Sequence, residues 1–177
     1  ARASTSNFGA IGGVAYAANR LDVGARLVGR AQGGGLFISD TLTVSAVGES
    51  TLTGTVVGLN MGGGDFAGSL QVAWLTANRD VIATAGGDGW AASHVTVTAR
   101  RADTLLGIGA TAQEGGASVG IAGNVLQTGG RTLAGFQAGG ASALGGTLTV
   151  RGEDESRALN IAVGAAAGGG FSAVGSL

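Results

Sequence analysis

The tripeptides Leu42-Thr43-Val44, Val95-Thr96-Val97 and Leu148-Thr149-Val150 lie 53 positions apart, and then 53 again. Pairs of glycine keep the same spacing along the chain: Gly62-Gly63, Gly115-Gly116 and Gly168-Gly169. A fixed period of this length is the signature of a repeat architecture. We therefore divide the 177 residues into a partial repeat (1–41), two full repeats (42–94 and 95–147) and an incomplete repeat (148–177).

Within a repeat, apolar residues occupy every second position. Residues 42–46 read LTVSA, residues 95–99 read VTVTA, and residues 148–150 read LTV. This alternation predicts β-strands with one buried face. The runs at 105–112 and 159–167 are small and apolar at most positions, which predicts strands packed closely against another backbone.

The composition favours stacked strands over helices. The chain contains 37 Gly and no Pro. Each Gly in a helix or strand interior costs roughly 0.5–1 kcal/mol relative to Ala, so the glycines belong at turns and close backbone contacts. The absence of Pro fits a ladder in which each amide donates to a neighbouring coil.

We predict an all-β fold, a parallel β-helix (β-solenoid) of 53-residue repeats, with two coils of about 26 residues in each repeat. Stacked antiparallel β-hairpins are the alternative. Residues 1–177 form a single segment in this interpretation. Because neither end resembles a polar capping repeat, we interpret the segment as a fragment of a longer array.

Charge and residue counts exclude several classes of function. The net charge is −1 and all ten basic residues are Arg, so no basic field is expected to bind nucleic acid. Without Cys, disulfides and thiolate sites are excluded, and one His, His94, cannot form a His-based metal cluster alone. Residues 158–177 carry no charge, but glycines interrupt them at 168–170, and we expect no membrane insertion.

Two segments resemble ligand sites only in part. The acidic run Glu153-Asp154-Glu155 could form a metal or carboxylate site, but adjacent carboxylates on a strand alternate faces. We predict a solvated turn there, with charges opposite to Arg100 and Arg101 one repeat earlier. The segment Gly86-Gly87-Asp88-Gly89-Trp90 lacks the tandem nine-residue copies of a calcium-binding β-roll.

Two further features carry weak functional signals. His94 could be combined with Asp88 or Asp103 into a hydrolase site, but no Gly-x-Ser-x-Gly segment accompanies it. Thr43, Thr96 and Thr149 are predicted to form an outward row, as in ice-binding solenoids, although Thr is also a favoured strand residue. The sequence thus predicts no catalytic, cofactor-binding or metal-binding residues and no cofactor.

The tract AAAGGGFSAVGS at 165–176, preceded by Leu148-Thr149-Val150 and by LNIAV at 159–163, resembles a known family. Its style is similar to the repeats of very large bacterial filamentous adhesins, the haemagglutinin-like and leukotoxin-like exoproteins of two-partner secretion. The resemblance covers most of the chain. It implies a β-helical shaft, an outer-membrane secretion partner, and a secreted or bacterial cell-surface location.

The expected function is therefore structural. The chain is predicted to be a shaft segment and rigid spacer for adhesion or for matrix, biofilm and fibre formation, without enzyme activity. Its expected partners are further copies, joined end to end or laterally, and a host surface or glycan. Two alternatives are a glycan- or surface-binding β-solenoid module that uses the Thr rows, and a carbohydrate-active β-helix enzyme with a groove of Asp and Glu from successive coils.

Overall fold

The computed structural model describes residues 2–3, 8–29, 36–37, 40–61, 64–87, 90–139, 143–168 and 170–176. Within these ranges the chain is all-β, with twelve strands and no helix. Sheet A contains β1 (Arg2–Ala3), β4 (Leu36–Phe37), β5 (Thr41–Met61), β8 (Trp90–Glu114) and β11 (Ala143–Ala167). Sheet B contains β2 (Phe8–Asn19), β6 (Phe66–Asn78), β9 (Ala117–Gly129) and β12 (Phe171–Ser176). Sheet C contains β3 (Val23–Gly29), β7 (Val81–Gly87) and β10 (Thr132–Ala138).

All strand pairings among the described residues are parallel. The alternative of stacked antiparallel hairpins is therefore wrong. Parallel strands need a crossover connection, and here each crossover is made of further strands instead of a helix. The arrangement is consistent with a β-helix or solenoid-like fold.

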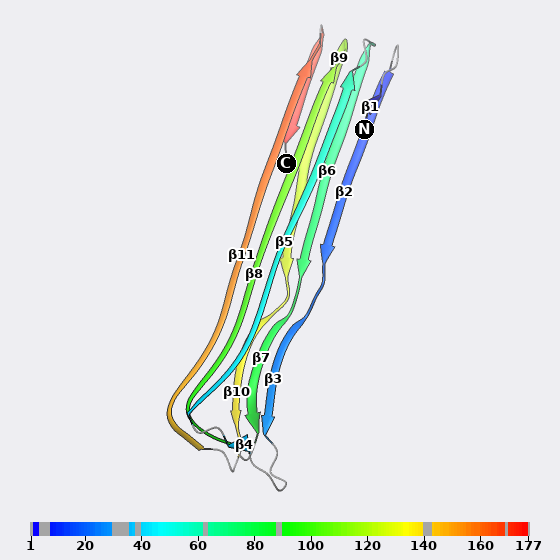
Figure 1. The fold of residues 1–177 in the computed structure, drawn as a ribbon. Helices are drawn as coiled ribbons and strands as arrows, with labels where there is room; N and C mark the ends of the chain where they lie inside the picture. The colour runs from blue at the N-terminus through cyan, green and yellow to red at the C-terminus, as the bar shows by residue number, and fades with distance from the viewer. Residues whose placement is uncertain are drawn as a thin grey trace.

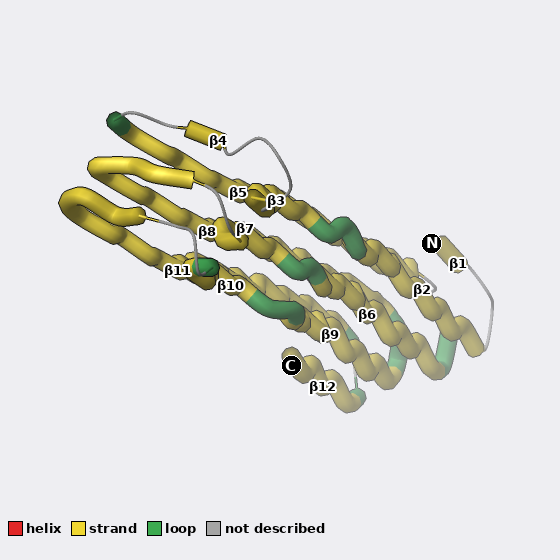
Figure 2. Tube along the Cα trace, turned by 90° about the horizontal axis from the view of Figure 1, so that it is seen from below, coloured by secondary structure: helices red, strands yellow, loops and turns green. Residues whose placement is uncertain are grey.

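The chain follows one long circuit (Figure 1). It runs along a long strand of sheet A and returns through one strand of sheet B and one of sheet C, so that the cross-section has two layers (Figures 1 and 2). The long strands β5, β8 and β11 of sheet A pair residues 53 apart over most of their length, as Thr43 does with Thr96 and Thr96 with Thr149. One circuit therefore takes the whole period, and the prediction of two coils per repeat is wrong. The reason is the uninterrupted length of β5, β8 and β11, which use up to 25 residues before the first turn.

The return strands have a different register from the long strands. Strands β6 and β9 pair residues 51 apart, so that Trp74 lies beside Val125 and Val72 lies beside Gly123. A uniform period of 53 would place Val72 beside Val125 instead. An offset of two residues leaves every side chain on its original face, because strand side chains alternate with a period of two. In the preceding circuit Tyr16 pairs with Trp74, which gives two aromatic neighbours in one row.

Two apolar clusters fill part of the space between the layers. The larger lies between sheets A and C and includes Val44, Val97 and Val81. The smaller joins Leu75 and Ala77 of β6 to Leu105 of β8. Towards the turn between sheets A and B the interior is polar instead. The buried polar side chains there are Asn60, Ser69, Gln71, Thr111, Gln113 and Ser118.

Glycines allow long polar side chains to fit into this interior. Gln71 is fully buried and faces Gly13 and Gly58, where an added Cβ would overlap its amide group. Glycine at these two positions thus has a specific cause, because it allows the two layers to approach closely around the Gln71 side chain. The first repeat is longer than the later ones between Arg20 and Leu42, which predicts a lengthened loop at Gly33–Gly35, and this segment lies outside the described residues.

Candidate functional site

A cluster of charged side chains lies between the layers, where the return path passes from sheet B to sheet C. Asp103 of β8 is fully buried and pairs with the buried Arg79 from the β6–β7 connection. The Ser50 hydroxyl of β5 donates to the same carboxylate at 2.7 Å. A buried pair of this kind costs desolvation, and the loss of one partner leaves an uncompensated charge.

Arg101 extends this cluster to the neighbouring circuits. Its guanidinium donates to the carbonyl oxygens of Gly129 (2.5 Å) and Arg79 (3.3 Å). It also pairs with Asp154 of β11, and its Nε lies 3.7 Å from Asp103 Oδ2. Two cations and two carboxylates thus balance their charge, and together they connect β5, β8 and β11 with the return layer. We call Arg79, Arg101, Asp103 and Asp154 the buried ion-pair cluster; the first three are buried, and Asp154 is the exposed member at its outer end.

A second group of charges lies on the outer face of sheet A. Arg100, on the middle strand, lies 3.8 Å from Glu49 of β5 and 3.9 and 3.2 Å from Glu153 and Glu155 of β11. Its hydrogen bond to Glu155 raises the pKa of Arg100 above its ordinary value. Exposed ion pairs contribute about 0–1 kcal/mol each, so this group favours one strand register without dominating stability.

The corner between sheets B and C carries the third group of charges, the ion pair of Arg131 and Asp80. Arg131 donates to Asp80 from Nη2 at 2.7 Å and from Nε at 3.0 Å, and its backbone N–H donates at 2.8 Å. The side-chain bond from Arg131 holds the pKa of Asp80 below its ordinary value. Since the folded-state pKa is lowered, the pair stabilises the fold above about pH 4 and loses that effect as the pH falls through the folded-state pKa.

Substitution Arg131→Gln should move the pKa of Asp80 upward, towards the ordinary aspartate value. A carboxyl-detected NMR titration of Asp80 measures the change. Arg157→Gln is the control, because it removes an arginine from sheet A, outside the Asp80–Arg131 pair. An unchanged Asp80 midpoint in Arg131→Gln would contradict the assigned cause.

Away from Arg100, the outer face of sheet A carries hydroxyl side chains that lie in register on neighbouring strands. Thr43, Thr96 and Thr149 form one row, with their neighbours Val95 and Val97 buried, which confirms the predicted outward orientation. In the adjacent row the His94 ring Nδ1 lies 2.7 Å from Thr147 Oγ1. These rows are what a glycan- or surface-binding module would use, and that alternative stays a prediction.

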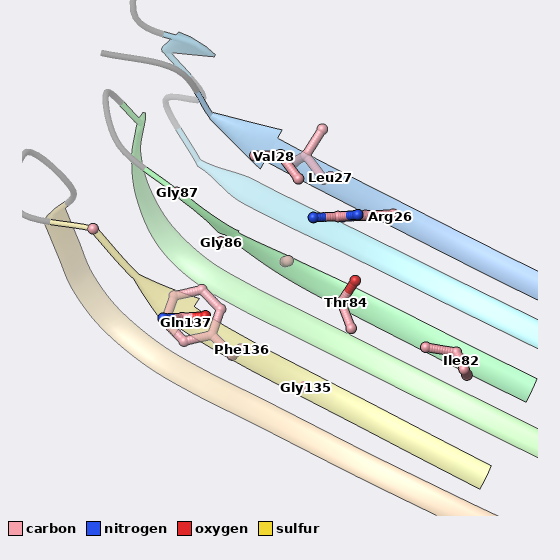
Figure 3. Close-up of a pocket in the computed structure, with 12 residues that line it drawn as sticks. Arg26, Leu27, Val28, Ile82, Thr84, Gly86, Gly87, Gly135, Phe136 and Gln137 are labelled. Atoms are coloured by element: carbon pink, nitrogen blue, oxygen red, sulfur yellow. The ribbon is translucent and has the colours of Figure 1, made fainter. Parts of the chain in front are cut away.

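The end of sheet C has a hollow of about 720 Å³ (Figure 3). Its lining comes from β3, β7 and β10 and includes Thr84, Phe136 and Gln137. Arg26 is the one ionisable side chain among the described residues that line it. A single cation without an acid or base beside it does not form a pair for acid–base chemistry.

The structure does not bring together most of the residues that the sequence suggested as possible sites. Glu153, Asp154 and Glu155 lie inside strand β11, so the predicted solvated turn is wrong. Because adjacent residues of a strand face opposite sides, Glu153 pairs outward with Arg100 and Asp154 pairs inward with Arg101. The opposite charges predicted one repeat apart do form pairs, but the pairs lie on two opposite faces of the sheet.

His94 and Asp103 do not come together. His94 is exposed on the outer face of β8, whereas Asp103 points between the layers. Asp88 and Gly89 lie outside the described residues, and Gly86 and Gly87 belong to β7 and not to a turn. Among the residues with described positions, no group of three or more His, Asp and Glu side chains could hold a metal ion.

In the described ranges of the chain, none of the elements is a helix long and apolar enough to cross a membrane. No protein-family model, no curated protein and no solved structure matches this chain.

Proposed function

We propose that this chain is a shaft segment of a secreted or cell-surface bacterial filamentous adhesin or exoprotein. In this proposal it is a β-solenoid in which each 53-residue repeat forms one circuit. It acts as a rigid spacer for adhesion or for matrix and fibre formation, and it has no catalytic role. An outer-membrane secretion partner and a host surface or glycan belong to the same proposal.

One observation supports it above the others: the links between circuits are continuous. Strands β5, β8 and β11 pair in parallel over almost their whole length. The buried ion-pair cluster and Arg100 connect the same three strands. In such a stack each circuit contacts only its neighbours, so stability is approximately a sum over circuits and interfaces. That is the property a spacer of adjustable length needs.

The geometry also explains why such a spacer requires many repeats. Strands in a sheet lie about 4.8 Å apart, so each further circuit lengthens the stack by only that amount. Each circuit uses many residues for this small gain in length, but it makes the stack wide, because a long strand of 25 residues spans about 80 Å. A wide, hydrogen-bonded cross-section resists bending better than a single strand or helix.

Single-molecule pulling on the two ends of the chain tests the spacer role. We expect circuits to separate one at a time from the ends, each releasing a contour length of about 190 Å. Force–extension curves with steps of that size support a stack of load-bearing circuits. If the chain extended without steps, at the low force that extends a disordered chain, the proposal would be overturned. Cysteines introduced at the two ends of β8 provide the control geometry, in which the load runs along the strands and the rupture force should be higher.

A further inference from the structure

Sheet B differs from the rest of the molecule because none of its four strands contains a charged residue. Its exposed large side chains are apolar and aromatic, with exposed fractions between 39% and 76%. We define the sheet B apolar face by the following residues: Val14, Tyr16, Leu70, Trp74, Ile121 and Val125. They lie on three neighbouring strands, β2, β6 and β9 (Figure 2).

The side of these strands that points inward is unusually polar. Ser69 and Gln71 alternate with Leu70 and are buried between the layers. Asn60 of sheet A donates across the layers to the carbonyl oxygens of Gly9 and Gly68 at 2.8 and 3.1 Å. Around Leu70 sheet B thus directs larger apolar side chains away from its own interior, whereas Leu75 and Leu126 point inward into the smaller apolar cluster. Contiguous exposed apolar surface of this kind marks an interaction site.

Trp74 is suited to burial in a contact. Its indole N–H already donates to the Thr76 hydroxyl at 3.1 Å. The ring can therefore be covered without leaving a polar group unsatisfied. Tyr16 lies beside it in the same row of the sheet. Aromatic residues of this kind are typical anchors of protein interfaces.

We propose that a second copy of this chain packs its sheet B apolar face against this one. The contact deepens the proposed function, because it would join neighbouring shafts side by side. A two-fold related copy presents the same flat, uncharged sheet, so no charge has to be desolvated or opposed. Four strands about 4.8 Å apart and up to 13 residues long give a footprint of about 700 Å² on each partner. The total, about 1,400 Å², falls within the range of specific interfaces.

A lipid surface is the other occupant that an uncharged apolar face could accept. The described structure favours the second copy, because segments that bind membrane surfaces combine an apolar face with Lys and Arg, and no strand of sheet B contains either residue. A second copy covers the face without needing such charges.

Sedimentation velocity of the whole chain over a range of concentrations tests the proposal. We expect a concentration-dependent dimer. Leu70→Lys should weaken self-association at least tenfold, because it places a charge in the centre of the contact. Thr96→Lys is the matched control: it adds the same charge to a central strand of sheet A, on the outer hydroxyl face, and should change the dissociation constant less than twofold.

Circular dichroism of each variant shows whether the sheets are retained. If Leu70→Lys does not fold, Trp74→Thr decides, because it removes an outward ring without adding charge, and the expected loss is again about tenfold. A chain that remains monomeric at the highest concentration, or a dimer that Thr96→Lys weakens as much as Leu70→Lys, overturns the proposal.

A second experiment tests the lipid alternative by measuring co-sedimentation of the chain with phosphatidylcholine vesicles and with vesicles containing phosphatidylglycerol. Vesicle binding that Leu70→Lys abolishes, without dimers in buffer, would assign the face to lipid and overturn the proposal. The pulling experiment on single molecules is independent of this contact. Failure of lateral pairing therefore leaves the spacer role intact, whereas failure of the spacer role appears in the force curves.

Discussion

Substitution Asp103→Asn is expected to lower the free energy of unfolding by about 3–5 kcal/mol, because it leaves the buried guanidinium group of Arg79 without its counter-charge. Arg79 and Asp103 are both almost completely buried, and Arg101 lies against the same carboxylate. Equilibrium unfolding in urea, monitored by circular dichroism, measures the loss.

Glu49→Gln is the matched control for this prediction. It also removes a carboxylate next to an arginine, but the Glu49–Arg100 pair is exposed and 3.8 Å long, so the loss should be about 0–1 kcal/mol. A double variant, Arg79→Met with Asp103→Leu, should recover most of the stability, since it removes both charges together. Equal losses in Asp103→Asn and Glu49→Gln would show that the cluster does not have the energetic role assigned to it.

The second large effect is expected at Gly130, in the corner between β9 and β10. Its φ of +103° lies in the left-handed region, and a Cβ there would overlap the carbonyl oxygen of Arg79 in the preceding circuit. Gly130→Ala should therefore cost at least about 1–3 kcal/mol from the backbone conformation, with the overlap adding to this.

Gly12→Ala provides the comparison for the corner. Gly12 lies on the outer face of β2, an added Cβ would meet no neighbouring group within 4 Å, and its φ is not in the left-handed region. This substitution should be neutral or stabilising by about 0.4–1 kcal/mol, because Ala restricts the unfolded chain. Urea unfolding of both variants measures the difference. If Gly130→Ala were as stable as Gly12→Ala, Gly130 would not have the importance assigned to it.

The long strands could be predicted from the sequence because their register and their pattern agree. Residues 53 apart, such as Thr43 and Thr96, are paired neighbours, and the alternation from Val95 onward correctly separates inward from outward positions. The same alternation, continued past Ala99, places Arg101 and Asp103 inward. This was the available signal for the buried ion-pair cluster, but charged residues are expected at the surface unless their partners are known.

The return path could not be predicted in the same way. Its register changes to 51 residues, so that Trp74 lies beside Val125 and not beside Gln127. Its partner atoms come from other circuits, as with Arg79 and Asp103, which are 24 residues apart. Such contacts depend on where the chain turns, and local patterns do not fix the number of coils per period. For the same reason the lack of charge in sheet B became meaningful only when its strands were seen to be neighbours.

The alternation along β8 also determines how such a chain can diverge. An inward residue such as Leu105 is enclosed by the opposite layer, so a change there must be matched by its neighbours. An outward residue such as Arg100 is constrained only by outward-facing neighbours, which are Val47 and Glu153 in its own row and Glu49 and Glu155 in the next row. The outside of the molecule can therefore be rewritten row by row over a constant scaffold, and one chain can carry different surfaces along its length.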